Sequence, residues 1–251
     1  VETHNFIGGS KAAIIAEDCS GCGLCAELCR FSAISEDFVV DPIECEGCGV
    51  CHAFCPEQAV DFQPRKCGEW FSSMTRFGPL VHARLGIGEE NSGKLVSLIR
   101  KQAQILAEHR GLELIVTDGP PGIGCPVIAS ITGATALLIV VEPTVSGLHD
   151  MRRVTELAHH FKIPAMVCIN KYELNEEMSS VIEGEIEKGK LMTVGRIPFD
   201  PAFTRAMVEG KTIIEYDPSS KLAETVSSIW RTIRSSEFLT KQEAKILPIM
   251  K

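Results

Sequence analysis

The sequence predicts an α/β protein with a mostly parallel sheet covered by helices on both faces, and a small α+β domain inserted near its beginning. Two features predict this fold class. Beyond residue 64, apolar strand-like runs alternate with helical patterns, as a parallel sheet with crossover helices requires. Before that point, eight of the eleven cysteines fall within 37 residues. Such crowding, with gaps of two residues, indicates metal ligation rather than disulfides.

The parallel sheet is expected to contain four strands, with ligands bound at their carboxyl ends. We predict strands at 112–118, 136–142, 164–170 and 191–198, and helices at 92–109, 147–161, 175–188, 201–209 and 219–234. Ser92 is the expected N-cap of the first helix. Because every strand but the last ends in a polar or turn residue, the binding residues should lie at this edge of the sheet.

Composition and charge exclude several classes of function. With 45% hydrophobic and 23% charged residues, the 251-residue chain is typical of a soluble globular protein. The net charge of -8 argues against binding to nucleic acid or anionic lipid. No apolar run approaches the roughly 20 residues that span a bilayer, and the first residues lack a signal-peptide pattern. The segment 241–251 is too short and too weakly apolar for a stable membrane anchor, so we expect a cytoplasmic protein.

Eight cysteines form two runs with the same spacing. The runs are Cys19, Cys22, Cys25 and Cys29, and Cys45, Cys48, Cys51 and Cys55, the second followed by Pro56. Residues 19–34 and 45–60 are therefore two copies of one pattern, 26 positions apart. Glycines flank the second cysteine of each run, which lets the backbone curl around a cubane and aim three thiolates at it. A fourth ligand has to come from elsewhere.

This spacing closely resembles that of two-cluster bacterial ferredoxins, in which the fourth cysteine of each run binds the other cluster. The resemblance implies two [4Fe-4S] clusters. One would be held by Cys19, Cys22, Cys25 and Cys55, and the other by Cys45, Cys48, Cys51 and Cys29. Structural zinc is the alternative, because paired Cys-x-x-Cys motifs also bind zinc. His52 is interpreted as a surface or hydrogen-bonding residue, since the cysteines already saturate both clusters.

The second half of the chain contains short segments whose order is informative. An apolar strand ends at Asp118, and the turn Gly119-Pro120-Pro121-Gly122, then EPTVSGLHD (142–150), INKYE (169–173) and GRIPFD (195–200) follow in that order. Together these segments resemble the MinD/ParA/Mrp group of P-loop ATPases, and within it the MinD-like ATPases with an inserted ferredoxin domain. The resemblance covers essentially the whole chain and implies a P-loop NTPase-like fold.

The same resemblance implies roles for residues at the strand ends. Asp118 would be the magnesium-linked catalytic carboxylate, and the glycine that ends the following turn would face the γ-phosphate. Asn170 would recognise adenine, Pro198 would lie against its ring, and Lys171 is a weaker candidate for nucleotide binding. The alternatives are that Asp118 and Asn170 only cap strand ends and that Lys171 is a solvated charge.

Members of this family begin with a strand and a Lys-Gly-Gly-x-Gly-Lys-Thr phosphate loop, which this sequence does not contain. Val1-Glu2 resembles the end of a segment that follows the loop, so about 35 upstream residues are expected to be missing. Residues 88–95 match the glycine and lysine spacing of a phosphate loop. We reject this match because Leu95 replaces the hydroxyl that holds magnesium, and Glu89 and Glu90 would repel phosphate.

Three cysteines lie outside the two runs. Cys125 follows Asp118 by seven residues, which resembles the offset of a cluster-bridging cysteine in the nitrogenase iron protein, a distant relative. A second bridging cysteine is not evident, so a buried or weakly reactive thiol is the favoured interpretation. Cys67 and Cys168 are expected to be core or surface thiols.

We therefore expect a remnant of an ATPase domain at 1–14, a ferredoxin domain with two [4Fe-4S] clusters at 15–64, and the remaining ATPase domain at 65–251. The expected function couples binding or hydrolysis of ATP, with Mg²⁺, to electron transfer or metallocluster handling. The expected partners are a redox partner or client protein and a second copy in a nucleotide-dependent homodimer. The alternative is an electron-transfer ferredoxin module on a degenerate scaffold that does not hydrolyse ATP, and a MinD-like positioning role is least favoured. ATPase activity stays open because the phosphate loop is missing.

Overall fold

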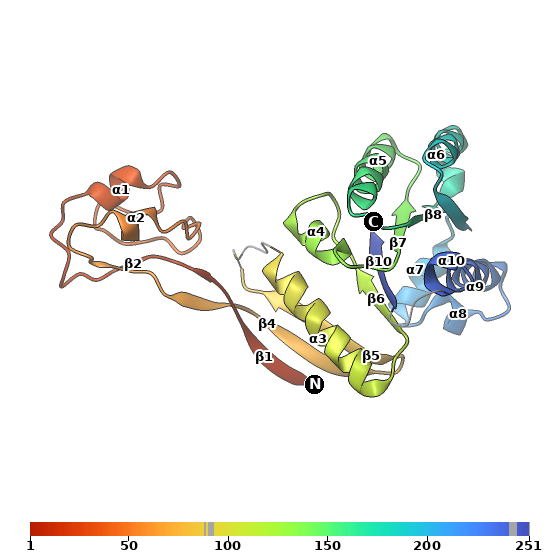
Figure 1. The fold of residues 1–251 in the computed structure, drawn as a ribbon, viewed down its shortest axis with the longest axis horizontal. Coiled ribbons are helices and arrows are strands. Elements are labelled where there is room, and N and C mark those ends of the chain that lie inside the picture. The colour runs from red at the N-terminus through yellow and green to blue at the C-terminus, as the bar shows by residue number, and fades with distance from the viewer. Residues whose placement is uncertain (88, 90–92, 241–244, 251) are drawn as a thin grey trace. The chain divides into compact units, whose positions relative to one another are not determined.

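The computed structural model describes residues 1–87, 89, 93–240 and 245–250 (Figure 1). The chain divides into two compact units, Val1–Ile99 and Arg100–Lys251. The expected N-cap Ser92 and most of the segment 88–92 lie outside the described residues.

The first unit contains a three-stranded antiparallel sheet that the sequence did not predict. In the order β1-β4-β5, its strands are β1 (Glu2–Ser10), β4 (Pro64–Thr75) and β5 (Gly78–Leu85). The helix α3 (Lys94–Arg110) begins in this unit, and Leu95 packs with Phe6 and Cys67 in a small core. Because β1 pairs with β4 along its length, the chain before the cysteine runs is held against the chain after them.

Between β1 and β4 the chain forms a small lobe, residues 11–63, which we call the cysteine lobe. Its elements are β2 (Ala13–Ile14), α1 (Leu24–Leu28), α2 (Val50–Ala53) and β3 (Val60–Asp61). The strands β2 and β3 pair antiparallel and bring the start and the end of the lobe together. Ala33, Ala59 and Val60 are its most deeply buried apolar residues.

The second unit contains a five-stranded parallel sheet in the order β6-β10-β7-β8-β9. The strands are β6 (Leu114–Asp118), β7 (Leu137–Val141), β8 (Ala165–Asn170), β9 (Met192–Ile197) and β10 (Lys245–Met250). The helices are α4 (Cys125–Ile131), α5 (Val145–His160), α6 (Glu176–Lys188), α7 (Pro201–Val208), α8 (Ile213–Tyr216), α9 (Lys221–Arg234) and α10 (Glu237–Thr240), with a 3₁₀ turn at Tyr172–Leu174. The predicted α/β fold class is confirmed, as are the four predicted strands.

Alternating side chains of the central strands build one core on each face of this sheet. On β7, Leu137, Ile139 and Val141 pack with apolar residues of α4, α5 and α6. Leu138, from the opposite face of the same strand, packs with Ile229 of α9 and with residues of α10. Helices therefore cover both faces, as predicted. None of the helices in the described ranges is long and apolar enough to span a membrane.

The strand β10 is the element of the sheet that the sequence did not predict. It lies between β6 and β7, where Leu247 is completely buried. Its register with β6 runs from Lys245 opposite Leu114 to Ile249 opposite Asp118. Residues 245–250, which the sequence analysis considered only as a membrane anchor, are thus a central strand of the second unit.

Candidate metal centres and nucleotide site

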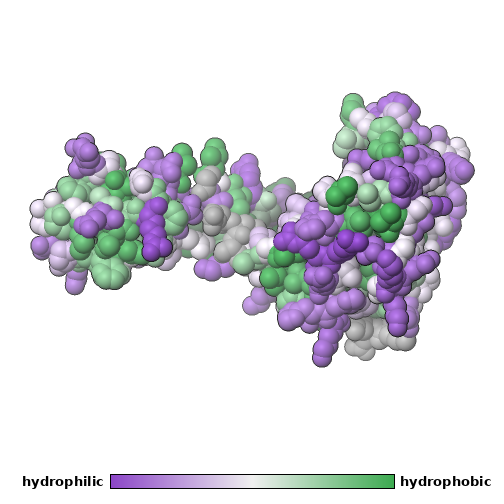
Figure 2. Space-filling view, turned by 90° about the horizontal axis from the view of Figure 1, so that it is seen from above, coloured by the Kyte–Doolittle hydropathy of each residue, from purple (hydrophilic) through white to green (hydrophobic). Residues whose placement is uncertain are grey.

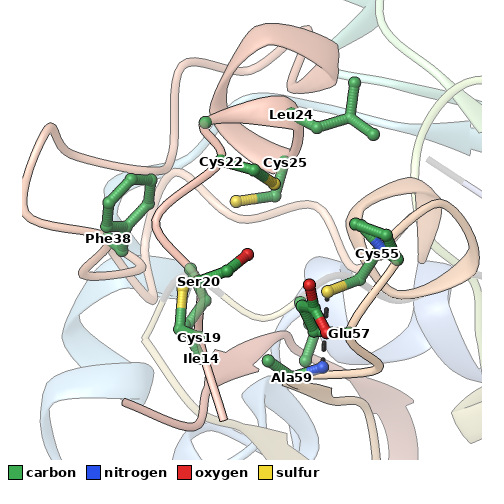
Figure 3. A pocket seen from close by; sticks show the side chains of 13 residues that line it. Ile14, Cys19, Ser20, Cys22, Leu24, Cys25, Phe38, Cys55, Glu57 and Ala59 are labelled. Carbon is green, nitrogen blue, oxygen red and sulfur yellow. Dashed lines mark hydrogen bonds between the residues drawn. The ribbon is translucent and has the colours of Figure 1, made fainter. Parts of the chain in front are cut away.

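Three cysteines of the first run and the last cysteine of the second run surround a cavity in the cysteine lobe (Figure 3). The four are Cys19, Cys22, Cys25 and Cys55. Cys25 lies on α1, and Cys22 lies in the loop just before that helix. The other lining residues are mostly apolar and include Ile14, Phe38, Ala59 and Val60. We call this the first cavity.

A second cavity in the lobe has the same construction with the two runs exchanged. Its cysteines are Cys45, Cys48, Cys51 and Cys29, and its other lining residues are again mostly apolar. The 26-position repeat relates the two linings, since Ile14 and Phe38 of the first cavity correspond to Val40 and Ala12 of the second. The structure thus brings together the two sets of four cysteines that the resemblance to ferredoxins implies.

The donor sets and their surroundings fit [4Fe-4S] clusters, for which four thiolates are the usual ligands. The Cys55 Sγ accepts a hydrogen bond from the Ala59 amide at 3.3 Å, an interaction that tunes cluster potentials. Burial raises the pKa of the Cys25 and Cys51 thiols, and bound iron would reverse that effect by stabilising the thiolates. Within the described part of the chain, no three His, Cys, Asp or Glu side chains converge on a point as a single ion requires, and the thiols are spread around the cavities instead.

His52 joins the second cysteine run to the strand β3. Its Nδ1 lies 2.6 Å from the carbonyl oxygen of Val60, and its ring stacks on Phe62 with 5.8 Å between the centroids. These contacts hold α2 against β3 next to both cavities, because Val60 lines the first and Phe62 lines the second. His52 is therefore a hydrogen-bonding residue, which was the interpretation favoured from the sequence.

The surface of the cysteine lobe presents both hydrophobic and hydrophilic residues (Figure 2). The lobe contains ten acidic and two basic residues, so its formal charge equals the -8 of the whole chain, and the rest of the chain carries 23 of each sign. Phe31 and Phe54 are 42% and 63% exposed. One cysteine of each cavity, Cys22 and Cys48, also reaches the surface. The edges of both cavities are thus accessible from the surface of the lobe.

At the carboxyl edge of the parallel sheet, a larger cavity lies between β7, β8, β10 and the start of α5. Its polar lining includes Glu142, Thr144, Asp150 and Asn170, and Met250 of β10 contributes to its apolar part. The Thr144 Oγ1 caps α5 by accepting a hydrogen bond from the Gly147 amide at 2.9 Å. Asn170, predicted from the sequence as the adenine-recognition residue, therefore lines a cavity at the expected edge of the sheet.

The other predicted nucleotide residues are spread along the same edge. Lys171 has a left-handed backbone conformation, and its Nζ forms an ion pair with Glu142 at 2.7 Å on the rim of this cavity. Asp118 ends β6 and is exposed, while Pro198 directly follows β9. The turn 119–122 follows β6, and its first amide donates a hydrogen bond to the Ile249 carbonyl at 2.7 Å. Of the predicted nucleotide residues, Asn170 lines this cavity and Lys171 contacts it through the ion pair with Glu142, while Asp118, the turn and Pro198 lie outside the lining.

Sequence reasoning missed several residues of this site. Glu142, Thr144 and Asp150 belong to the quoted EPTVSGLHD segment, so its polar residues were the available signal. Met250 could not be found because β10 was not predicted. Cys125 is exposed at the first residue of α4, so of the two expected alternatives, a buried or a weakly reactive thiol, the structure excludes the buried one.

This chain is similar to known proteins both in the first cysteine run and over most of its length. Residues 12–35 match the model of the 4Fe-4S binding domain family. An uncharacterized protein of Methanocaldococcus jannaschii is 31% identical over 220 residues, which cover 88% of this chain and 73% of that protein. An uncharacterized ATP-binding protein of the same organism is 24% identical over 123 residues, and the aligned region spans 49% of this chain and 47% of that protein. The crystal structure of the cell division ATPase MinD from Pyrococcus furiosus matches with a TM-score of 0.51 and 19% identity, covering 65% of this chain and 68% of that one.

The fold and the cysteine cavities define an iron–sulfur protein whose second unit has the fold of MinD. The chain belongs to the same family as the Methanocaldococcus protein that is 31% identical to it, and it combines a 4Fe-4S binding domain with a MinD-like fold.

Proposed function

We propose that this protein is a cytoplasmic electron carrier with two [4Fe-4S] clusters, and that ATP bound with Mg²⁺ at the MinD-like unit controls its electron transfer. In this proposal, residues 15–64 are a ferredoxin domain inserted between the parts of an ATPase domain at 1–14 and 65–251. The observation that carries the proposal is the pair of cavities, each surrounded by four cysteines contributed by both runs. Each bound cluster supplies one-electron redox chemistry.

Saturated ligand sets favour electron transfer over delivery of a cluster to a client. Each cavity already has four thiols and a largely apolar lining, so a cluster held there has no open position for a ligand from another protein. Iron and sulfide measured on anaerobically prepared protein should each reach about eight per chain. Colourless protein that contains zinc instead would remove the redox proposal and leave only the fold.

The nucleotide part of the proposal rests on the shared edge of the sheet. Asp118 is the proposed magnesium-linked carboxylate, Asn170 the adenine-recognition residue, and Lys171 and Pro198 contribute at neighbouring strand ends. The turn 119–122 is proposed to face the phosphates. Since ligands in open α/β sheets bind beyond the carboxyl ends of the strands, these positions agree with one bound nucleotide. The Methanocaldococcus protein that is 24% identical to this chain is named as an ATP-binding protein, which supports nucleotide binding here.

Calorimetry with the intact gene product tests nucleotide binding. We expect MgATP to bind, and Asp118→Asn to weaken binding only when Mg²⁺ is present, because the carboxylate acts through the metal. Glu113→Gln is a suitable control, since Glu113 is an exposed acid just before β6. Coupling is then measured as the rate of cluster reduction by dithionite with and without MgATP. Binding without any change in that rate would exclude nucleotide control of electron transfer.

A second candidate is an electron carrier on a scaffold that no longer hydrolyses ATP. The carboxylates Glu142 and Asp150 line the large cavity at the carboxyl edge, and like charge disfavours phosphate there. This lining favours occupation by the nucleoside part of a ligand, with any phosphates outside. Absence of phosphate release from saturating MgATP by the intact protein would support this candidate, and steady turnover would exclude it.

The proposed partners follow from charge and from the family. The acidic cysteine lobe fits a redox partner or client with a basic surface. A nucleotide-dependent homodimer is proposed because nucleotide binding closes dimers in such folds. Size-exclusion chromatography with and without MgATP tests it.

A further inference from the structure

The internal repeat makes the two cysteine cavities nearly equivalent in charge. Each is lined by one carboxylate, Glu57 in the first cavity and Glu46 in the second. Much of the apolar lining also corresponds through the repeat, with Phe38 of the first cavity replaced by Ala12 of the second, although Phe31 and Phe62 line only the second cavity. Two clusters bound in these linings alone would have similar reduction potentials.

The equivalence ends one residue before Phe38 and Ala12. Asp37 precedes Phe38, whereas Lys11 precedes Ala12, so the repeat places opposite charges beside the two cavities. The residues differ in burial as well, because Asp37 is exposed whereas the Lys11 side chain is only 12% exposed. Water screens the charge of Asp37 much more than the charge of Lys11.

Contacts hold Lys11 against the loop that carries the second cysteine run. Its Nζ donates a hydrogen bond to the Pro42 carbonyl. Pro42 follows Asp41, whose Oδ1 accepts a hydrogen bond from the Ile43 amide at 2.7 Å and whose carbonyl accepts one from the Cys45 amide at 3.1 Å. The ammonium group is therefore fixed to the turn that leads into Cys45.

Two further charged groups lie beside Lys11, a buried carboxylate and the partly exposed guanidinium of Arg65, whose side chain is 36% exposed. The Glu89 carboxylate lies 3.9 Å from the Lys11 Nζ and forms an ion pair with Arg65. The Glu89 side chain is 9% exposed. Lys11 and Arg65 balance the carboxylates of Glu89 and Asp41, so the group beside the second cavity is neutral, whereas the first cavity has Asp37 at the place equivalent to Lys11.

We propose that Lys11 gives the cluster at the second cavity the higher reduction potential, so that an electron entering the lobe comes to rest there. This inference rests on the proposed function, since it requires a cluster in each cavity. A one-electron donor is oxidised and one cluster takes up the electron, which adds one negative charge. A nearby buried cation stabilises that charge, and an acidic residue opposes it. The cluster at the second cavity is therefore the one that holds the electron at equilibrium.

The test is a redox titration of the intact protein, with the reduced clusters followed by electron paramagnetic resonance. The wild type should show two midpoint potentials. Lys11→Gln should lower the higher one, with about a tenfold change in the reduction equilibrium, equivalent to about 59 mV for one electron. Lys11→Arg keeps the charge and should leave both potentials in place. Asp37→Asn should raise the lower potential instead.

Several outcomes would overturn the proposal. It fails if Lys11→Gln lowers the lower potential, or lowers both equally, or changes neither. Iron content separates this failure from failure of the proposed function, because wild-type protein with only about four irons per chain has no second cluster to compare. If Lys11→Gln loses a cluster, the proposal is tested with Glu89→Gln and Asp37→Asn instead. Glu89→Gln must then raise the higher potential, and Asp37→Asn must raise the lower one. Any other pattern contradicts the role of Lys11.

Discussion

At the scale of single residues, the loop of the second cysteine run is built against the backbone of β1. Gly47 has a φ of 62°, and a Cβ on it would lie 2.2 Å from the Ser10 carbonyl oxygen. Gly23 has a similar φ of 80°, but a Cβ there would meet nothing within 4 Å. Both positions require left-handed backbone, and only Gly47 also requires the absence of a side chain.

Gly47→Ala should therefore disrupt the second cluster, while Gly23→Ala should be tolerated. The conformational cost is about 1–3 kcal/mol at either position, and only Gly47→Ala adds a clash with backbone that cannot rotate away. Iron per chain, measured after anaerobic reconstitution, should fall from about eight to about four in Gly47→Ala and stay near eight in Gly23→Ala. Equal iron in the two variants would show that the contact with Ser10 does not shape the site.

A buried thiol makes the free energy of unfolding depend on pH in the alkaline range. Cys168 lies in the core of the second unit, and burial raises its pKa from 9.0 to about 11. The folded state thus holds this proton more tightly than the unfolded state. The resulting stability is complete below about pH 9 and is lost as the pH rises towards 11.

Cys168→Val removes this titration at nearly constant volume. The free energy of unfolding of the wild type should fall by up to about 2–3 kcal/mol relative to the variant between pH 8 and pH 11. Urea unfolding followed by far-ultraviolet circular dichroism at several pH values measures the difference. A difference that does not change with pH would show that the thiol ionises in the folded protein as easily as in the unfolded one.

At the scale of elements, four strands of the parallel sheet were predictable because their apolar runs are local features. The strand β10 was not, since Pro248 lacks the amide donor of a central strand and usually argues against one. The structure accommodates Pro248 because β10 pairs with β7 only at Ile249 and Met250, beyond the proline. The sheet of β1, β4 and β5 depends on pairing across the whole cysteine lobe, which local sequence does not reveal.

The two candidate sites also differ in whether they depend on local sequence or on long-range packing. The cysteine ligand sets follow from spacing within 37 residues, because a cluster loop is a local structure. The cavity at Asn170 depends instead on α5 and β10 meeting β7 and β8, so Met250 and Asp150 were not identified. Long-range packing therefore limits what sequence reasoning finds at the nucleotide edge.

The importance of β10 can be tested at Leu247. Its side chain is completely buried between the helices α9 and α10 and the sheet, so Leu247→Ala should cost about 2–5 kcal/mol of unfolding free energy. Leu174→Ala is the matched control, because Leu174 is 62% exposed and its truncation should change stability by less than about 0.5 kcal/mol. Urea unfolding of the two variants gives the comparison. Similar small effects would mean that residues 245–250 are not part of the core in solution.

At the scale of the whole molecule, the cysteine lobe differs from the rest of the chain in charge as well as in fold. The cysteine lobe carries the entire formal charge of -8, and the rest of the chain is balanced. Bound clusters with four thiolates each make the lobe still more negative. Electrostatic steering therefore acts at the part of the protein that we propose exchanges electrons.

This division predicts how electron transfer to a basic acceptor protein depends on salt. The second-order rate constant, measured by stopped-flow, should fall at least about tenfold between low salt and 0.5 M, where the screening length is only about 4 Å. A small uncharged acceptor should show no such fall. Glu17→Gln with Asp18→Asn, next to Cys19, should slow the reaction at low salt only.

The matched control removes two charges from the other unit by Glu176→Gln with Glu177→Gln at the start of α6, where both side chains are exposed. The net charge of the protein is then the same in both double variants. If the rate falls only in the lobe variant, the local field of the lobe guides the partner. Equal slowing in both would show that only the total charge matters, and docking on the cysteine lobe would have to be abandoned.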